Sequence, residues 1–378
     1  MKDKMLILTN RTLHNGPRMI REFNTFQQEF DITAIGKTKP GKDNIRFEHI
    51  DNYKPLHVKV LNKYFRILFY KKITSKIFEN YSKLEKYIED NKFKVVIIHD
   101  SIFLPVIHRL KNKLEFIAVY NAHEYHPLEF EEEPAWLKTE GQYQYALYRK
   151  YLTDIDLLVN VCDGIAEKCE QEFQKKSLVI PNVAGLSAIK PSINNGVIKM
   201  IYHGGIMKSR GLENMLDIAR ILGENYTLDI MAVKSGNNQQ YYDFLRQYAA
   251  DIKNVNFIPP VPFNEIIPKI NTYDIGLYML MPTNFNNYYA LPNKLFEFIQ
   301  AKLAIAIGPT IEMKKVVEKY NIGVVSDDFT AENLAQKIKS LSREDIAQFK
   351  TNTVAASATE NAEYYSALYS EKVKALCV

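Results

Sequence analysis

The sequence predicts an α/β protein of two Rossmann-like, doubly wound domains that face each other across a cleft. Three observations support this fold class. The 378 residues exceed what one hydrophobic core usually supports, so two domains are expected. Short runs rich in Ile and Val alternate with longer helical patterns, as in the buried strands of a parallel sheet. The alternation restarts after a connector near the middle of the chain, which indicates a second sheet of the same kind.

In the first half, helical patterns over 77–90 and 143–152 separate the strand candidates. The expected strands are MLILT, FDITAIG, KVVIIHD, EFIAVYN and DLLVNV. The connector 182–195 carries turn-forming residues and prolines without a sustained period, which is typical of a linker. The first domain is therefore expected to span 1–181. The tail 358–378, rich in helix formers, is predicted to cross back to it.

The second domain is expected to span 196–357. Its strand candidates are KMIYHGG, TLDIMAVKSG, NVNFIPPVP, YDIGLYML, LAIAIG and IGVVSDD, with helices opening near Leu212, Gln239, Asn264, Asn293, Glu312 and Ala331. Open parallel sheets bind ligands beyond the carboxyl ends of their strands. Functional residues are therefore expected in the loops that follow strands.

The composition is that of a globular protein, because 46% of the residues are hydrophobic and 25% are charged. Three cysteines without metal-ligand spacing argue against a disulfide framework. The amino-terminal apolar run has only four residues, from Met5 to Leu8, which is too short for a signal sequence or a membrane span. A cytoplasmic location is expected. The net charge of +5 is modest, and no nucleic-acid partner is expected.

The segment 57–76 concentrates basic charge, with six Lys or Arg among Tyr, Phe, Leu and Ile and no acidic residue. One interpretation is a helix with a core face and a solvated basic face. The other is an interfacial helix that rests on anionic lipid headgroups, which would place the protein at the inner face of the cell membrane. The sequence leaves both interpretations open.

Two loops of the first half carry candidate substrate-binding residues. Gly16 forms a turn before a helix that carries Arg18, and a basic helix amino terminus suits an anionic ligand. A simple turn with Arg18 in solvent is the alternative. The loop does not match GxGxxG, which argues against a dehydrogenase. After EFIAVYN, His123 and Glu124 could hydrogen-bond a hydroxyl-rich substrate, whereas His126 is assigned a structural role.

Two loops of the second half carry the candidate phosphate and ribose contacts. In IYHGGIMKSRGLENML, Gly205 permits close backbone approach, and two cations, Lys208 and Arg210, could neutralise a diphosphate. The alternative is a turn with two solvated cations. In NNYYALPNKLFEFIQAKLAIAIG, the Lys294 ammonium could face phosphate, and Glu297 could accept two hydrogen bonds from ribose hydroxyls. The alternative there is an amphipathic helix with Glu297 exposed.

Taken together, HGG…KSRG, NVNFIPPVP, the Asp274 that opens DIGLY, and LPNKLFEFIQAKLAIAIG resemble the second domain of family 4 retaining glycosyltransferases of the GT-B fold. NAHEYHP and IPN look like matching landmarks in the first half. The resemblance spans nearly the whole chain and is strongest over 198–325. The PNKLFE helix is similar to that of bacterial enzymes of surface polysaccharide synthesis, such as capsule and lipopolysaccharide.

The resemblance implies transfer of a sugar from a nucleotide-sugar donor to a glycan or lipid-linked glycan acceptor, with retention at the anomeric carbon. It implies no metal or other cofactor, and the HEYH run does not match the HExxH pattern of zinc enzymes. The implied catalytic residues are His123, Arg210 and Lys294. From the loops and the resemblance together, the predicted substrate-binding residues are Gly16, Arg18, Glu124, Gly205, Lys208, Val261, Tyr289, Leu291, Pro292, Asn293 and Glu297.

Two positions depart from the family pattern. Tyr289 stands where the family often has a second Glu eight positions before the ribose Glu. Gly205 stands where an Arg commonly follows the first glycine, and Lys208 could take the place of that Arg. Two alternatives stay open: a sugar-nucleotide epimerase of the same fold, and a non-catalytic sugar-nucleotide-binding partner, which the two departures make conceivable.

Overall fold

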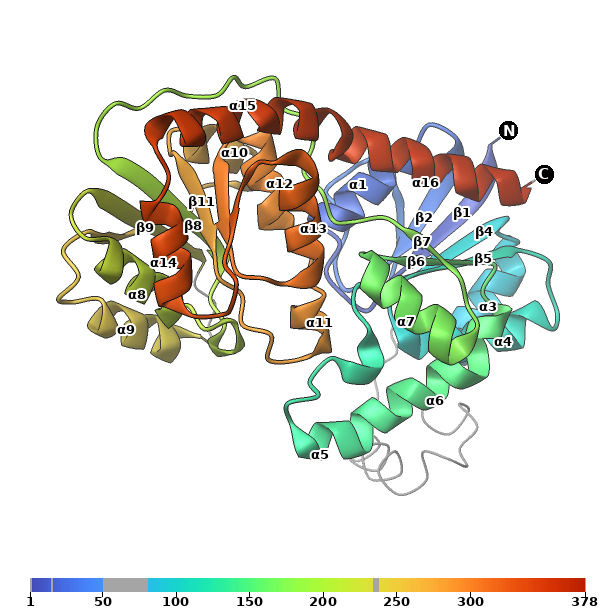
Figure 1. Cartoon of the computed structure of the whole chain (residues 1–378). Coiled ribbons are helices and arrows are strands. Elements are labelled where there is room, and N and C mark those ends of the chain that lie inside the picture. Colours follow the sequence, from blue (N-terminus) through green and yellow to red (C-terminus); the bar gives the residue numbers. More distant parts are fainter. Residues whose placement is uncertain (1, 15, 50–80, 234–237, 378) are drawn as a thin grey trace. The chain divides into compact units, whose positions relative to one another are not determined.

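The computed structural model describes residues 2–14, 16–49, 81–233 and 238–377, which form two compact units (Figure 1). Unit 1 comprises Met1–Pro181, Asn284–Asn286 and Tyr365–Val378, and unit 2 comprises Asn182–Thr283 and Asn287–Tyr364. The basic segment 57–76 lies outside the described residues. Each unit is built on its own parallel sheet.

Unit 1 contains a seven-stranded sheet in the order β3-β2-β1-β4-β5-β6-β7. The strands are β1 (Asp3–Leu8), β2 (Phe30–Ile35), β3 (Arg46–Glu48), β4 (Val95–Ile98), β5 (Ile117–Asn121), β6 (Leu157–Asn160) and β7 (Ser177–Val179). Its main helices are α1 (Pro17–Phe26), α3 (Ser82–Asn91), α4 (Leu104–Lys111), α6 (Gln142–Tyr151) and α7 (Asp163–Phe173), with the short α5 (Pro134–Trp136). The strand order reverses direction between β1 and β4, where ligands of such sheets usually bind.

Unit 2 contains a six-stranded sheet in the order β10-β9-β8-β11-β12-β13. The strands are β8 (Ile198–Gly205), β9 (Tyr226–Val233), β10 (Val255–Ile258), β11 (Ile275–Tyr278), β12 (Ala304–Ile307) and β13 (Gly323–Val325). Its helices are α8 (Glu213–Leu222), α9 (Gln239–Tyr248), α10 (Ile266–Ile270), α12 (Asn293–Gln300), α13 (Ile311–Tyr320), α14 (Ala331–Lys339) and α15 (Arg343–Thr359), with α11 (Phe285–Tyr288) at the boundary of the units. The order reverses between β8 and β11.

The central strands are buried on both faces, as the continuous apolar runs predict. Every residue of β4, β5, β11 and β12 is buried, because helices cover both sides of each sheet. The edge strands β3 and β7 have only three residues each and are partly exposed, and the sequence pattern does not predict them. The predicted fold class of two Rossmann-like parallel sheets is confirmed.

The tail of the chain returns to unit 1, as predicted. Helix α16 (Ala362–Cys377) enters unit 1 at Tyr365 and lies beside α1 (Figure 1). Its Tyr369 ring packs edge-on against Phe26 of α1 with ring centroids 5.0 Å apart, and Val373 is also part of the unit 1 core. The carboxyl-terminal helix therefore forms part of the hydrophobic core of unit 1.

Helix α12 packs very closely on β11 because Gly276 has no side chain. A Cβ atom at this position would lie 2.4 Å from the Phe298 ring, which is closer than any real contact. The close approach buries the whole of α12 from Lys294 to Gln300. The packing of the Phe298 ring on Gly276 therefore determines how deeply Lys294 and Glu297 are buried.

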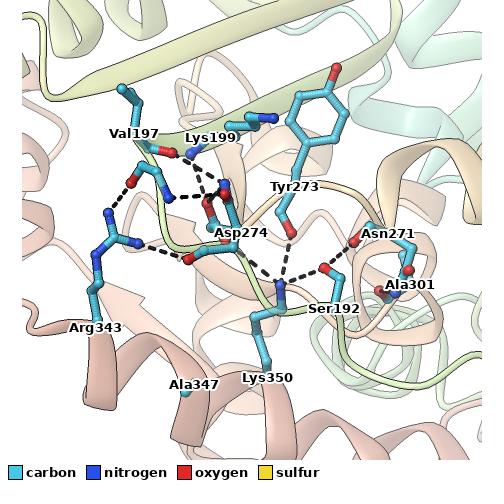
Figure 2. A network of polar contacts seen from close by, with 12 residues as sticks. Ser192, Val197, Lys199, Asn271, Tyr273, Asp274, Ala301, Arg343, Ala347 and Lys350 are labelled. Carbon is cyan, nitrogen blue, oxygen red and sulfur yellow. Dashed lines mark hydrogen bonds and ion pairs between the residues drawn. The ribbon is translucent and has the colours of Figure 1, made fainter.

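A buried polar network joins the connector to α15 within unit 2 (Figure 2). Asp274 accepts a hydrogen bond from the Lys199 amide at 2.9 Å. Lys350 of α15 donates to the Ser192 hydroxyl and to the Tyr273 carbonyl, both at 2.9 Å. Its ammonium lies 3.8 Å from the Asp274 carboxylate, and the two side chains are only 3% and 6% exposed. This ion pair holds the start of β8 against the long helix.

We expect Lys350→Met to lower the free energy of unfolding by about 3 kcal/mol or more, because it leaves the Asp274 carboxylate buried without its cation. The matched control is Lys337→Met, which removes the cation of an exposed ion pair with Asp327 and should change stability little. Urea denaturation followed by circular dichroism measures both. Equal losses in the two variants would contradict a structural role for the buried pair.

Candidate functional site

A group of charged side chains gathers in unit 2 where β8 ends and α12 begins. Gly204 and Gly205 are the last residues of β8, and Arg210 ends the short 3-10 helix Lys208–Arg210 that follows. Lys294 and Glu297 lie on the first turn and a half of α12. These residues therefore lie at the sheet edge where open α/β sheets bind their ligands. We call Gly204, Gly205, Arg210, Lys294 and Glu297 the cation cluster.

The Lys294 ammonium is the buried charge at the centre of the cation cluster. The residue is 7% exposed. Its Nζ atom lies 4.1 Å from the centre of the Tyr278 ring and 5.3 Å from that of the Tyr202 ring. Burial lowers the pKa of Lys294 to about 7, Arg210 acts in the same direction, and Glu297 opposes them. An anion bound here would stabilise the charged form of Lys294.

The two cations of the cluster lie against consecutive glycines. The backbone of Gly204 has a φ of +121°, and a Cβ atom there would lie 3.5 Å from Lys294 Cε. Arg210 Nη1 donates to the Gly205 carbonyl oxygen at 3.1 Å. A side chain at Gly204 would be strained at this φ, so the strand end requires glycine.

Glu297 is buried beside a neutral imidazole. The residue is 6% exposed, and its Oε2 atom lies 3.4 Å from His203 Nε2. Burial, aided by the charge of Lys294, lowers the pKa of His203 to about 3, so the contact is not an ion pair at neutral pH. Within the described residues, His203 Nε2 has no hydrogen-bond partner. The alternative of an exposed Glu297 is therefore wrong, and sequence analysis did not select His203, although it directly precedes the two glycines.

The other residues predicted in unit 2 surround the cluster at its loops. Lys208 is exposed, and no described contact joins it to Lys294 or Glu297. Pro292 is the N-cap residue of α12, and its carbonyl accepts a hydrogen bond from the Leu295 amide at 3.1 Å. Half-buried positions before or at the helix start are Tyr289, Leu291 and Asn293, and Val261 is half-buried in the loop after β10.

In unit 1, the predicted residues gather where α1 begins and β5 ends. Gly16 is the N-cap residue of α1. Arg18 Nη1 donates to Asn121 Oδ1 at 3.4 Å, and burial, followed by the charge of Arg21, lowers the pKa of Arg18 to about 9. Arg18 in turn lies close enough to His123 and Glu124 for their charges to interact. The structure therefore brings Arg18, His123 and Glu124 to one edge of the sheet.

Two buried residues next to His123 were not selected by sequence analysis. Glu22 of α1 is 3% exposed, and His99, directly after β4, is fully buried. Their side chains are joined by a 2.6 Å contact between Glu22 Oε2 and His99 Nε2, and His99 Nδ1 lies 3.1 Å from His123 Nε2. The available sequence signal was the HD pair directly after the apolar run KVVII.

His126 lies apart from this group. Its Nδ1 atom is 3.1 Å from the Tyr120 hydroxyl and 3.0 Å from the Tyr148 hydroxyl. Burial lowers the pKa of His126 to about 4, so the imidazole is neutral and belongs to a buried aromatic cluster.

In the described part of the chain, no group of three or more His, Cys, Asp or Glu side chains is arranged to hold a metal ion. A search of the same residues finds no helix with the length and apolar character needed to cross a membrane.

Neither a family model nor a curated protein sequence matches the chain. Among solved structures, sucrose-phosphate synthase from Thermosynechococcus elongatus aligns with a TM-score of 0.74 at 11% identity, over 99% of this chain and 99% of that one. HepE from Anabaena, in complex with UDP, aligns with a TM-score of 0.71 at 12% identity, over 98% and 100%. The lipopolysaccharide outer core galactosyltransferase WaaB aligns with a TM-score of 0.67 at 11% identity, over 98% and 99%. The likeness shows that the chain has the GT-B fold of these structures.

We expect Lys294 to titrate at about pH 7 in the free protein. Arg210→Gln should raise its pKa, because the Arg210 charge lowers it, and Glu297→Gln should lower it further. NMR titration of ¹³C-labelled lysine measures the shift, with the resonance assigned by its loss in Lys294→Met. Lys113, whose pKa is raised by its hydrogen bond to Glu89, is the internal reference. A Lys294 pKa that neither variant moves would contradict the cation cluster.

Proposed function

We propose that this protein is a retaining glycosyltransferase, of hexosyl or related type, that moves a sugar from a nucleotide-sugar donor to a glycan or lipid-linked glycan acceptor. The observation that carries the proposal is the cation cluster at the carboxyl end of β8, in which Lys294 and Glu297 are buried and Arg210 is half-buried. The proposed setting is bacterial surface polysaccharide or lipopolysaccharide synthesis at the cytoplasmic face of the membrane. Solved structures of the same fold include a sucrose-phosphate synthase, a galactosyltransferase and a UDP complex, which supports a nucleotide-sugar substrate.

The charges of the cation cluster match those of a nucleoside diphosphate. Lys294 and Arg210 lie at consecutive glycines, and the charge of Arg210 lowers the pKa of Lys294. A diphosphate would supply that anion and could also accept hydrogen bonds from the first amides of α12. Glu297, buried one turn along, would accept hydrogen bonds from the two ribose hydroxyls. This arrangement favours a nucleotide over a simple phosphate.

The proposed reaction uses the same cations in its transition state. Negative charge grows on the diphosphate as the glycosidic bond breaks, and fixed cations in a dry site stabilise that charge more than water does. The reaction needs no protein nucleophile and no metal ion, because an oxygen of the leaving diphosphate can take the proton of the acceptor hydroxyl on the same face. His123, Arg18 and Glu124 of unit 1 would bind and orient sugar hydroxyls.

We expect Arg210→Ala and Glu297→Ala each to lower sugar transfer by about 100-fold or more, since each removes a group that acts on the leaving nucleotide. A thermal-shift screen of UDP-, GDP- and ADP-sugars identifies the donor, and initial rates of nucleotide release measure the effect. The matched control is Arg220→Ala on α8, which removes an exposed arginine paired with Asp217.

Normal turnover in both site variants would contradict the assignment. Conversion of the nucleotide-sugar without any acceptor would favour an epimerase. Binding of a nucleotide-sugar without turnover would favour a non-catalytic partner.

We also expect binding of the nucleoside diphosphate to weaken as the pH rises above about 7. The free chain then loses the Lys294 proton, whereas the bound anion favours the charged ammonium, so that binding must take up a proton. Calorimetry in two buffers of different ionisation enthalpy measures an uptake of up to about one proton per nucleotide near pH 8. Lys294→Met should abolish the uptake. The same uptake in wild type and variant would show that another group titrates.

A further inference from the structure

A chain of three polar side chains runs from the buried interior of unit 1 to a partly exposed imidazole. The carboxylate of Glu22 contacts His99 Nε2 at 2.6 Å, and His99 Nδ1 contacts His123 Nε2 at 3.1 Å. Glu22 and His99 are 3% and 0% exposed, whereas His123 is only half-buried. We call Glu22, His99 and His123 the relay. Glu22 belongs to α1, and His99 and His123 lie just after β4 and β5, so the three residues of the relay come from three separate parts of the chain.

The other oxygen of Glu22 is occupied by donors that hold the carboxylate in place. Asn121 Nδ2 donates to Glu22 Oε1 at 3.0 Å, and the Tyr369 hydroxyl of α16 donates to the same oxygen at 3.2 Å. Burial alone would raise the pKa of Glu22, but His99 and these hydrogen bonds hold it below its usual value. Glu22 is therefore ionised at neutral pH and acts only as an acceptor.

The opposite end of the relay is held neutral. Burial lowers the pKa of His123 well below its usual value, and the charges of Arg18 and Arg11 act in the same direction. A neutral imidazole carries one N–H and one lone pair. The position of that single hydrogen decides whether Nδ1, the other ring nitrogen of His123, donates or accepts.

Counting hydrogens along the relay gives the position. The Glu22 carboxylate can only accept, so a neutral His99 carries its single hydrogen on Nε2 and presents a lone pair on Nδ1. The contact between His99 Nδ1 and His123 Nε2 then needs a hydrogen from His123. His123 therefore carries its hydrogen on Nε2, and its Nδ1 is left as an acceptor. A buried carboxylate holds a catalytic histidine in one tautomer by the same logic in the serine proteases.

We propose that Glu22 and His99 are positioning residues that hold His123 in the tautomer whose Nδ1 accepts a hydrogen bond from a hydroxyl of the bound sugar. The identity of that ligand rests on the proposed function, whereas the tautomer does not. The inference assigns a role to two residues that sequence analysis did not select.

Replacing Glu22 by glutamine should exchange donor and acceptor at each hydrogen bond of the relay while the contacts stay in place. The amide oxygen must stay where Asn121 and Tyr369 donate, so the amide nitrogen faces His99 and donates to Nε2. His99 then carries its hydrogen on Nδ1 and donates to His123 Nε2. His123 in turn carries its hydrogen on Nδ1, which becomes a donor in place of an acceptor.

The test is ¹⁵N NMR of the histidine side chains in the full chain, which distinguishes the two tautomers directly. We expect His123 to carry its hydrogen on Nε2 in the wild type and on Nδ1 in Glu22→Gln. The matched control is Glu29→Gln, which removes a carboxylate that also binds α16, through Ser370 and Lys374, but lies outside the relay. The control should leave the His123 tautomer unchanged.

A wild-type His123 with its hydrogen on Nδ1 would overturn the inference without any variant. An unchanged tautomer in Glu22→Gln, or an inversion in Glu29→Gln, would overturn it as well. These NMR measurements need no substrate, so their outcome does not depend on the proposed function.

Transfer assays then test the positioning role. Glu22→Gln should lower kcat/KM by about tenfold, the effect of losing one hydrogen bond to the sugar, while nucleotide binding to unit 2 stays unchanged. An inverted tautomer with unchanged sugar transfer would overturn the positioning role.

Discussion

Burial of the Lys294 ammonium constrains the elements around the start of α12. Moving an ammonium out of water is costly unless other groups compensate for the lost hydration. Here the faces of the Tyr278 and Tyr202 rings and the field of Glu297 supply part of that compensation. Gly204, with a φ of +121°, leaves room for the ammonium at the end of β8. The strand end, the two tyrosines and the helix must therefore keep their places together for Lys294 to stay buried.

The buried charges of this protein differ in how completely they are compensated. Lys350 has two hydrogen bonds at 2.9 Å and the Asp274 carboxylate, and Glu22 accepts from an imidazole, an amide and a hydroxyl. Both therefore behave as satisfied structural groups. Lys294 instead meets aromatic faces and a second cation, and its pKa falls to about 7. Strongly perturbed charges of this kind concentrate at functional sites, which is why we place the binding of an anion at Lys294 and not at Lys350.

Local patterns in the sequence were sufficient for the strands other than β3 and β7, because apolar runs form them, and for the position of α12, because a turn with proline precedes it. They could not decide whether Glu297 is buried, since that depends on Phe298 packing on Gly276 of another strand. The relay could not be predicted from the sequence either, because Glu22 and His99 are 77 residues apart in the chain. The membership of 284–286 in unit 1 depends on contacts such as that between Asn284 and Glu132, 152 residues apart. Features that depend on contacts between distant segments therefore could not be predicted from the sequence.

The two units place different chemistry at equivalent edges of their sheets, and the difference fits a division of roles. In the proposed reaction, a group that stabilises growing negative charge must carry positive charge once the diphosphate is bound, as Arg210 and Lys294 would. A group that orients a neutral hydroxyl needs instead a donor or acceptor in a defined position. His123 meets that need because burial keeps it neutral and Glu22 determines its tautomer through His99. The polar residues of unit 1 therefore suit recognition of a sugar, and those of unit 2 suit the departure of a nucleotide.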